Sequence, residues 1–359
     1  MKKSLALLSA AALTLGLLSG CGGSNSGDAK YPGTADKGVV NVYNWGVYID
    51  ESVLDDFTAE TGIKVVYDTF ESNEAMYGVL KNEGASYDVV IPSDYMISRM
   101  IEEDMLEPLN FDNIPNFEDV DPALKNPDYD PENLYSVPYM WGLMGVIYNK
   151  TMVDEADLGS WDLLWNEKYA DDILMIDNSR DAIGIALKSL GYSYNTTDEA
   201  QITEAVDLLI QQKPLVQAYV MDEIFGKLEG GNAYVGTYYY GDYLTMLENN
   251  PDLGFYIPEE GTNIYVDAMC IPKGAANKEN AEAFINFMCS TEAGLKNCEE
   301  IWYSTPLLSV REALDPEVSS DPYAYPTADI LAKCESYAGL PQNILDLYDS
   351  EWTRLKSAT

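Results

Sequence analysis

The segment Tyr265-Val266-Asp267 offers a ring and a carboxylate at the spacing of a β-strand. Alternate residues of a strand point to the same face, so Tyr265 and Asp267 would lie side by side. A carboxylate binds an ammonium group through a charge-assisted hydrogen bond that contributes about 1.5–3 kcal/mol. A ring that faces the ammonium adds about 0.5–2 kcal/mol. Periodicity alone favours an exposed strand face with an ordinary aspartate, but the pair also suits a site for a small organic cation.

Two further rings, Trp45 and Tyr48, follow an apolar run that begins at Val39. Ligands of open α/β sheets bind outside the carboxyl ends of the strands, so we expect both rings in a binding crevice. Residues 177–181 (DNSRD) have the plain interpretation of a helix N-terminus stabilised by acidic residues. The three tyrosines at 238–240 suit either a hydrophobic core or a ferric site.

The first third of the chain repeats a strand–helix pattern three times. We expect strands at residues 39–45, 64–70 and 87–92, each followed by an amphipathic helix, the third capped by Ser93. Three such units predict a parallel sheet covered by helices. No turn between them carries a glycine-rich phosphate-binding motif. The strand ends place six side chains along one rim: Trp45, Tyr48, Phe70, Glu71, Ser93 and Tyr95.

Two apolar segments, residues 135–148 and 262–271, are expected to cross between two lobes. A further strand is expected at residues 234–241. Helical patterns occupy residues 161–165, 182–190, 199–210, 281–288 and 330–356. Two lobes joined by two or three crossings form a hinge that can close around a ligand.

The composition is strongly acidic, with 60 Asp and Glu against 21 Lys and Arg, no His, and a net charge of −39. Such a charge repels nucleic acid and anionic lipid and attracts cations. We therefore expect no nucleic-acid partner. An exported glycosidase with paired carboxylates is the enzyme alternative, although the absence of His removes the commonest general base. An adhesive surface protein would show internal repeats, and none is evident.

The first twenty residues are typical of a signal peptide, with Lys2 and Lys3 before an apolar run that ends at Leu18. The following Ser19-Gly20-Cys21 resembles the lipobox of bacterial lipoproteins, which implies cleavage before Cys21 and lipid attachment to its sulfur. Two acyl chains give stable anchoring. Residues 1–20 are thus the expected signal peptide, and residues 21–37 an anchored flexible tether.

Four other cysteines remain: Cys270, Cys289, Cys298 and Cys334. In an exported protein they could form two disulfides, and as small apolar residues they could equally be buried thiols. Neither their spacing nor any His resembles a metal site.

Short motifs throughout residues 39–356 resemble the spermidine/putrescine-binding proteins of polyamine ABC importers. They occur in the order expected for that family. The motifs are residues 43–48 (YNWGVY), 57–65 (FTAETGIKV), 71–77 (ESNEAMY), 87–95 (YDVVIPSDY), 136–142 (SVPYMWG), 190–193 (LGYS), 285–287 (INF) and 303–306 (YSTP).

The resemblance implies an α/β, two-lobed periplasmic-binding-protein fold of type II, with a hinge between two mixed-sheet lobes. The expected N-terminal lobe comprises residues 38–139 and 269–309, and the C-terminal lobe residues 140–268 and 310–359. It further implies a monomeric, non-enzymatic receptor without cofactor or metal. Such a receptor is anchored at the outer face of the cytoplasmic membrane, or lies in the periplasmic space, and delivers a polyamine to a permease and its ATPase.

Carried over by position, the family's binding residues imply aromatic walls, a hydroxyl and acidic partners in the cleft. These positions are Trp45, Tyr48, Ser93, Tyr95, Asn178, Asp181, Tyr239, Tyr265, Asp267 and Tyr303. Tyr239 and Tyr265 replace tryptophans of the family. Better-known members have carboxylates at the positions of Val47 and Asn178, and a Gln near Ala338. Fewer anionic partners suit two ammonium groups better than three, which favours putrescine as a hypothesis. A receptor of the same fold for Fe³⁺ is the nearest alternative.

Overall fold

The computed structural model describes residues 37–83 and 87–358. The expected signal peptide, the lipid-attachment residue Cys21 and the tether up to residue 36 lie outside the described residues. Within the described chain, no helix is both long enough and apolar enough to cross a bilayer.

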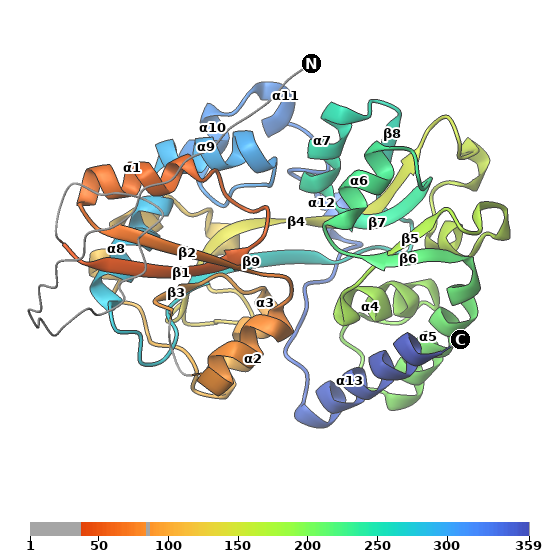
Figure 1. The fold of residues 1–359 in the computed structure, drawn as a ribbon, viewed down its shortest axis with the longest axis horizontal. Helices are drawn as coiled ribbons and strands as arrows, with labels where there is room; N and C mark the ends of the chain where they lie inside the picture. Colours follow the sequence, from red (N-terminus) through yellow and green to blue (C-terminus); the bar gives the residue numbers. More distant parts are fainter. Residues whose placement is uncertain (1–36, 84–86, 359) are drawn as a thin grey trace, which may run out of the picture.

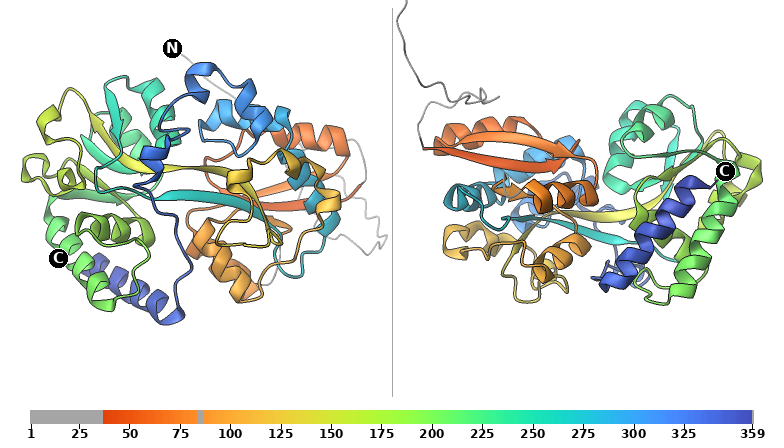
Figure 2. Two further views of the ribbon diagram at one scale, coloured as in Figure 1. Left: turned by 180° about the vertical axis from the view of Figure 1, so that it is seen from behind. Right: turned by 60° about the horizontal axis from the view of Figure 1, so that its bottom comes forward.

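Two lobes lie side by side and are bridged by the strands β4 (Ser136–Asn149) and β9 (Ile264–Cys270) (Figures 1 and 2). The strands follow the order β2-β1-β3-β9-β4-β7-β5-β6, with β8 also paired to β4. The first half of β4 pairs antiparallel with β9, and its second half pairs with β7 and β8. The apolar segments at 135–148 and 262–271 are thus strands that run through both lobes, as predicted.

The other strands belong to one lobe each. They are β1 (Val39–Trp45), β2 (Lys64–Phe70), β3 (Val89–Val90), β5 (Ile173–Ile176), β6 (Val216–Val220), β7 (Val235–Tyr239) and β8 (Leu253–Tyr256). The helices of the first lobe cover the left part of Figure 1. They are α1 (Ser52–Thr61), α2 (Asn73–Glu83), α3 (Asp94–Glu102), α8 (Lys278–Met288), α9 (Thr291–Ile301) and α10 (Leu308–Ala313). The remaining helices are α4 (Ser179–Ser189), α5 (Glu199–Gln212), α6 (Glu223–Glu229), α7 (Tyr240–Asn249), α11 (Pro316–Ser319), α12 (Ala328–Leu331) and α13 (Gln342–Ser357).

The first two strand–helix units form as predicted. The parallel strands β1 and β2 coincide with the predicted residues 39–45 and 64–70. Helix α1 buries Val53, Leu54 and Phe57 and ends at Gly62, whose φ of 77° suits glycine. The third strand, predicted over residues 87–92, is only the two-residue β3. Pro92 lacks the N–H that would extend the ladder.

The predicted C-terminal helix over residues 330–356 is wrong in its first half. Only α12 and α13 are helical there, and residues 332–341 run irregularly between the lobes (Figure 1). Pro341 precedes the first residue of α13, where its fixed φ suits a helix start. Gly339 passes so close to α3 that a Cβ would lie 2.6 Å from Oγ of Ser98. The predicted helix over residues 161–165 is a 3₁₀ turn.

Each lobe has its own hydrophobic core. One cluster packs α4, α5, α7 and α13 around the second half of β4. Two clusters pack α1, α2, α3, α8 and α9 around β1 to β3 and β9. The four described cysteines are free thiols, three of them buried within the first lobe's cores. Of the two possibilities that the sequence left open, Cys270, Cys289 and Cys298 are therefore buried thiols.

Candidate functional site

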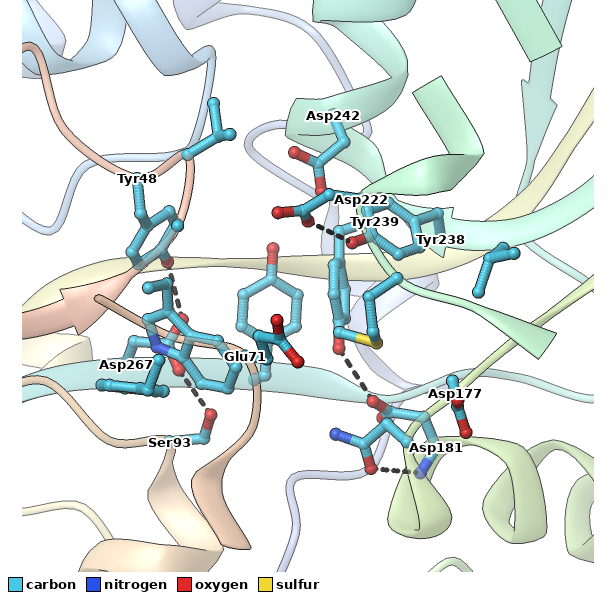
Figure 3. A pocket seen from close by; sticks show the side chains of 18 of the residues that line it. Tyr48, Glu71, Ser93, Asp177, Asp181, Asp222, Tyr238, Tyr239, Asp242 and Asp267 are labelled. Carbon is cyan, nitrogen blue, oxygen red and sulfur yellow. Dashed lines mark hydrogen bonds between the residues drawn. The ribbon is translucent and has the colours of Figure 1, made fainter. Parts of the chain in front are cut away.

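A cavity of about 550 Å³ lies between the lobes. Its wall includes all ten positions carried over from the family resemblance. Trp45 and Tyr48 come from the loop after β1, and Ser93 and Tyr95 from the start of α3. Carboxylates approach from several elements of both lobes (Figure 3). Parallel strands β1 to β3 therefore end at the rim expected from their sequence.

Asp267 on β9 forms the acidic end of the cavity nearest the first lobe. Its side chain accepts hydrogen bonds from the hydroxyls of Tyr48 and Ser93, each at 2.6 Å. Burial raises the pKa of the Asp267 carboxyl to about 6. The hydrogen bonds from the two hydroxyls lower this pKa, but their effect is smaller than that of burial. Ser93 directs its hydroxyl to Asp267 and makes no cap bond to α3, so the predicted capping role is wrong.

Tyr265 lies two residues before Asp267 on the same strand. Both are buried, with 6% and 5% of their surfaces exposed, and both line the cavity. The exposed strand face that periodicity favours is therefore wrong, because Tyr48 and Ser93 cover Asp267 and the rings of Tyr239 and Tyr303 pack against Tyr265. The alternation of a strand does bring the ring and the carboxylate to one face, as expected.

Asp181 lies in the first turn of α4, in the second lobe. It accepts hydrogen bonds from Tyr239 and Tyr337, each at 2.8 Å. Burial raises the pKa of the Asp181 carboxyl to about 6, although the hydrogen bonds from those two hydroxyls lower it. Asn178 caps α4 with its side-chain oxygen, which accepts from the backbone N–H groups of Arg180 and Asp181. That oxygen is engaged by the helix.

Asp242 is a third buried carboxylate that the sequence reasoning missed. It lies in the first turn of α7, three residues after Tyr239, and accepts a 2.6 Å hydrogen bond from Tyr303. Burial raises the pKa of the Asp242 carboxyl to about 8, so this group is mostly protonated at neutral pH. Residues three apart lie on the same face of a helix, so a helix starting at Tyr239 would place Asp242 on the same face as Tyr239. This spacing is the sequence signal that could have identified Asp242.

Aromatic rings fill the wall between these carboxylates. The ring of Tyr239 lies 4.9 Å from that of Tyr265, and Tyr48 lies 4.8 Å from Tyr303, both edge-to-face. Trp45 packs against Phe70 at 4.6 Å. The rings therefore offer faces and edges to the cavity while their hydroxyls orient the acids.

The remaining acidic side chains of the wall are Glu71, Asp177, Asp222 and Glu223. Among the described residues, no lysine or arginine lines the cavity. Within the same part of the chain, no group of three His, Cys, Asp or Glu could hold a metal ion. The cavity is thus an acidic, aromatic slot whose charge is not neutralised by its own walls.

Two departures from the family pattern lie at the edge of the cavity. Val47 is 61% exposed at its mouth, where it adds no charge. Beside it, a Cβ on Gly46 would lie 3.1 Å from Oδ2 of Asp222, so the lobes meet closely there. Ala338 lies outside the cavity wall, and its neighbour Tyr337 occupies the wall instead. Tyr337 was not predicted, because it lies in the irregular segment between α12 and α13.

Because the pKa of Asp242 is raised, we expect that replacing its carboxyl by a neutral amide stabilises the protein, and that the gain depends on pH. Between the ordinary pKa near 3.8 and the folded-state pKa of about 8, unfolding releases a proton and becomes easier as pH rises. Asp242→Asn keeps an acceptor for Tyr303 but carries no charge. We expect its melting temperature to exceed that of the wild type by about 2–4 °C or more at pH 8, and the two to converge near pH 4.

Asp130→Asn is the matched control in the same thermal scans. Asp130 is also buried, but it accepts four hydrogen bonds, from the N–H groups of Leu134, Tyr135 and Ser136 and the hydroxyl of Ser136. An amide accepts fewer of them, so this variant should melt below the wild type. Equal or lower stability of Asp242→Asn at pH 8 would contradict a desolvated, unneutralised carboxyl.

Comparisons with known proteins place the chain in a family. Residues 52–327 match the model of the bacterial extracellular solute-binding proteins. The spermidine/putrescine-binding periplasmic protein of Salmonella typhimurium is 36% identical over 93% of each chain.

Two solved structures are 41% identical and cover 89% of this chain and 99% of their own. One, from Listeria monocytogenes and described as a spermidine/putrescine ABC transporter, has a TM-score of 0.86. The other, the spermidine/putrescine ABC transporter substrate-binding protein of Streptococcus pneumoniae, has a TM-score of 0.76. These similarities confirm the predicted two-lobed α/β architecture. The chain therefore belongs to the bacterial extracellular solute-binding protein family.

Proposed function

We propose that this protein is the solute receptor of an ABC importer and binds a polyamine, putrescine or spermidine, between its lobes. The observation that carries this proposal is a pair of buried carboxylates, Asp267 and Asp181, separated by aromatic rings in a cavity without a basic residue in its described wall. Buried charges require a partner. A cation with two separated positive ends satisfies both acids, and the related proteins named above support this ligand class.

In the proposed complex, one ammonium group donates to Asp267 and another to Asp181. The hydroxyls of Tyr48 and Ser93 already hold Asp267 in place, so little ordering is needed when the ligand arrives. The faces of Tyr239 and Tyr265 pack the methylene chain and attract its charged ends.

We further propose a preference for the diamine putrescine. Asn178 is neutral and its oxygen caps α4, Val47 has no charge, and Asp242 is mostly protonated at pH 7. Of the buried acids of the wall, Asp267 and Asp181 are then the two ionised ones, and they match two ammonium groups. The other acids of the wall are partly or fully exposed, namely Glu71, Asp177, Asp222 and Glu223. Spermidine binding about tenfold more tightly than putrescine would refute this preference.

The two lobes would close by a hinge at their crossings. The boundaries that we propose remain residues 38–139 and 269–309 for one lobe, and 140–268 and 310–359 for the other. The closed receptor is then recognised by a permease, which together with its ATPase takes up the amine. On this view the protein is a monomer without catalytic activity, and the buried carboxylates serve binding.

Lipid anchoring through Cys21 completes the proposal, because it would hold the receptor beside its permease at the outer face of the membrane. Replacing residues 1–21 by the signal peptide of a non-lipidated exported protein removes the sulfur that would carry the lipid, together with the apolar run that an uncleaved signal peptide would leave in the membrane. We expect this variant to move from the membrane fraction of cells to the soluble exported fraction, with unchanged amine affinity. Its retention in the membrane fraction would contradict the anchor.

Asp267→Asn tests the ligand site. It removes a charge partner while preserving volume, so amine affinity should fall by about 1.5–3 kcal/mol, or roughly 10- to 150-fold. Isothermal titration with putrescine and spermidine measures the change. The melting temperature of the ligand-free variant reports whether the fold is intact.

Asp154→Asn is the control for this titration. It removes one acidic charge from an exposed position of the second lobe, outside the cavity wall. Its affinity should equal that of the wild type. Unchanged affinity of Asp267→Asn would take Asp267 out of the site, and absence of any amine binding by the wild type would reject the proposed function.

A further inference from the structure

The ammonium group of Lys356 contacts a carboxylate and a ring of the cavity wall. Its Nζ donates to Oδ1 of Asp177 at 2.8 Å. It also lies 5.1 Å from the ring centre of Tyr219 and 5.5 Å from that of Trp352. Asp177 and Tyr219 both line the cavity. The chain thus places one of its own cations against two residues of the wall of a site proposed for cations, although Lys356 itself is not part of that wall.

The parallel strands β5 and β6 position this group of residues. Asp177 follows the last residue of β5, and its N–H donates to the carbonyl of Val220 at the end of β6 at 2.9 Å. Tyr219 comes from β6, and its ring packs edge-to-face on Trp352 of α13 at 5.8 Å. Their position is the carboxyl end of two neighbouring strands, where ligands of α/β folds bind.

The C-terminal turn of α13 is fixed where it delivers Lys356. Nζ of Lys213 holds this turn in place, because it donates hydrogen bonds to the carbonyls of Leu355, Lys356 and Ala358. Lys356 therefore reaches Asp177 from a defined helix end. Its position is a property of the fold of the second lobe.

The chemistry around Lys356 repeats that of the inner site. Each ammonium position combines a carboxylate with aromatic rings: Asp181 with Tyr239 inside, and Asp177 with Tyr219 and Trp352 outside. Figure 3 shows Asp177 beyond Asp181, on the side away from Asp267. An amine that extends past Asp181 in this direction would approach Asp177 next.

We propose that Asp177, Tyr219 and Trp352 form an outer ammonium subsite that Lys356 fills, so that Lys356 selects against longer polyamines. This inference rests on the proposed function and extends it to ligand length. Short diamines bind without disturbing Lys356. A tetraamine such as spermine reaches the outer subsite only by displacing it.

Displacement is feasible because the ion pair is partly exposed. Side-chain exposures are 41% for Lys356 and 35% for Asp177, and such pairs shift an equilibrium by only about 2- to 5-fold. Lys356 is therefore a modest selectivity filter that leaves the inner site intact.

Lys356→Met tests the filter, because it keeps an apolar stem for the rings and removes the charge. At low ionic strength we expect spermine affinity to rise about 2- to 5-fold by isothermal titration, with putrescine affinity unchanged. Lys168→Met is the matched control. It removes one charge of the same lobe from an ion pair with Asp154 and Asp157, outside the cavity. It should change neither affinity.

A second readout uses the wild-type chain. The lysines are first converted to ¹³C-dimethyl-lysines, which keep their charge, and the reagent is removed before any amine is added. The NMR signal of Lys356, assigned by its loss in Lys356→Met, should shift with spermine and stay in place with putrescine. The inference is overturned if spermine leaves that signal unchanged, or if Lys356→Met alters putrescine and spermine affinity equally. A wild-type protein that binds no amine would reject the proposed function instead.

Discussion

A carboxylate taken out of water without a counter-ion raises the free energy of the folded state, and this protein does so at three places around one cavity. Asp181, Asp242 and Asp267 are all buried, and burial is the largest cause of the raised pKa of each. Tyrosine and serine hydroxyls hold them, but hydroxyls carry no positive charge. The fold therefore leaves an electrostatic deficit that a cation from outside can fill.

Two buried acids away from the cavity, Asp88 and Asp130, have a different role. Asp130 accepts three backbone N–H groups and a hydroxyl, and Asp88 accepts backbone and side-chain donors of Asn41 and Asn277. Those carboxylates hold loops and strands together. Around the cavity, the burial of Asp181, Asp242 and Asp267 costs stability, and a cation that binds there would return it.

Much of the fold and part of the site follow from local patterns. The apolar runs of β1 and β2 and the glycine that ends α1 predict those elements, and strand alternation places Tyr265 beside Asp267. Asp242 and Tyr337 did not follow, because their positions depend on contacts between segments distant in the sequence: Asp242 accepts from Tyr303, and Tyr337 donates to Asp181 and packs on Tyr95. Ser93 shows the same limit, since a residue typical of a helix cap instead bonds an acid distant in the sequence.

The most direct measurement is a crystal structure of the protein grown with putrescine. The account predicts one amine in the cavity, with one nitrogen within hydrogen-bond distance of Asp267, the other within that distance of Asp181, and the methylenes against Tyr239 and Tyr265. An amine found away from both carboxylates, or a cavity that stays without amine at saturating putrescine, would contradict it.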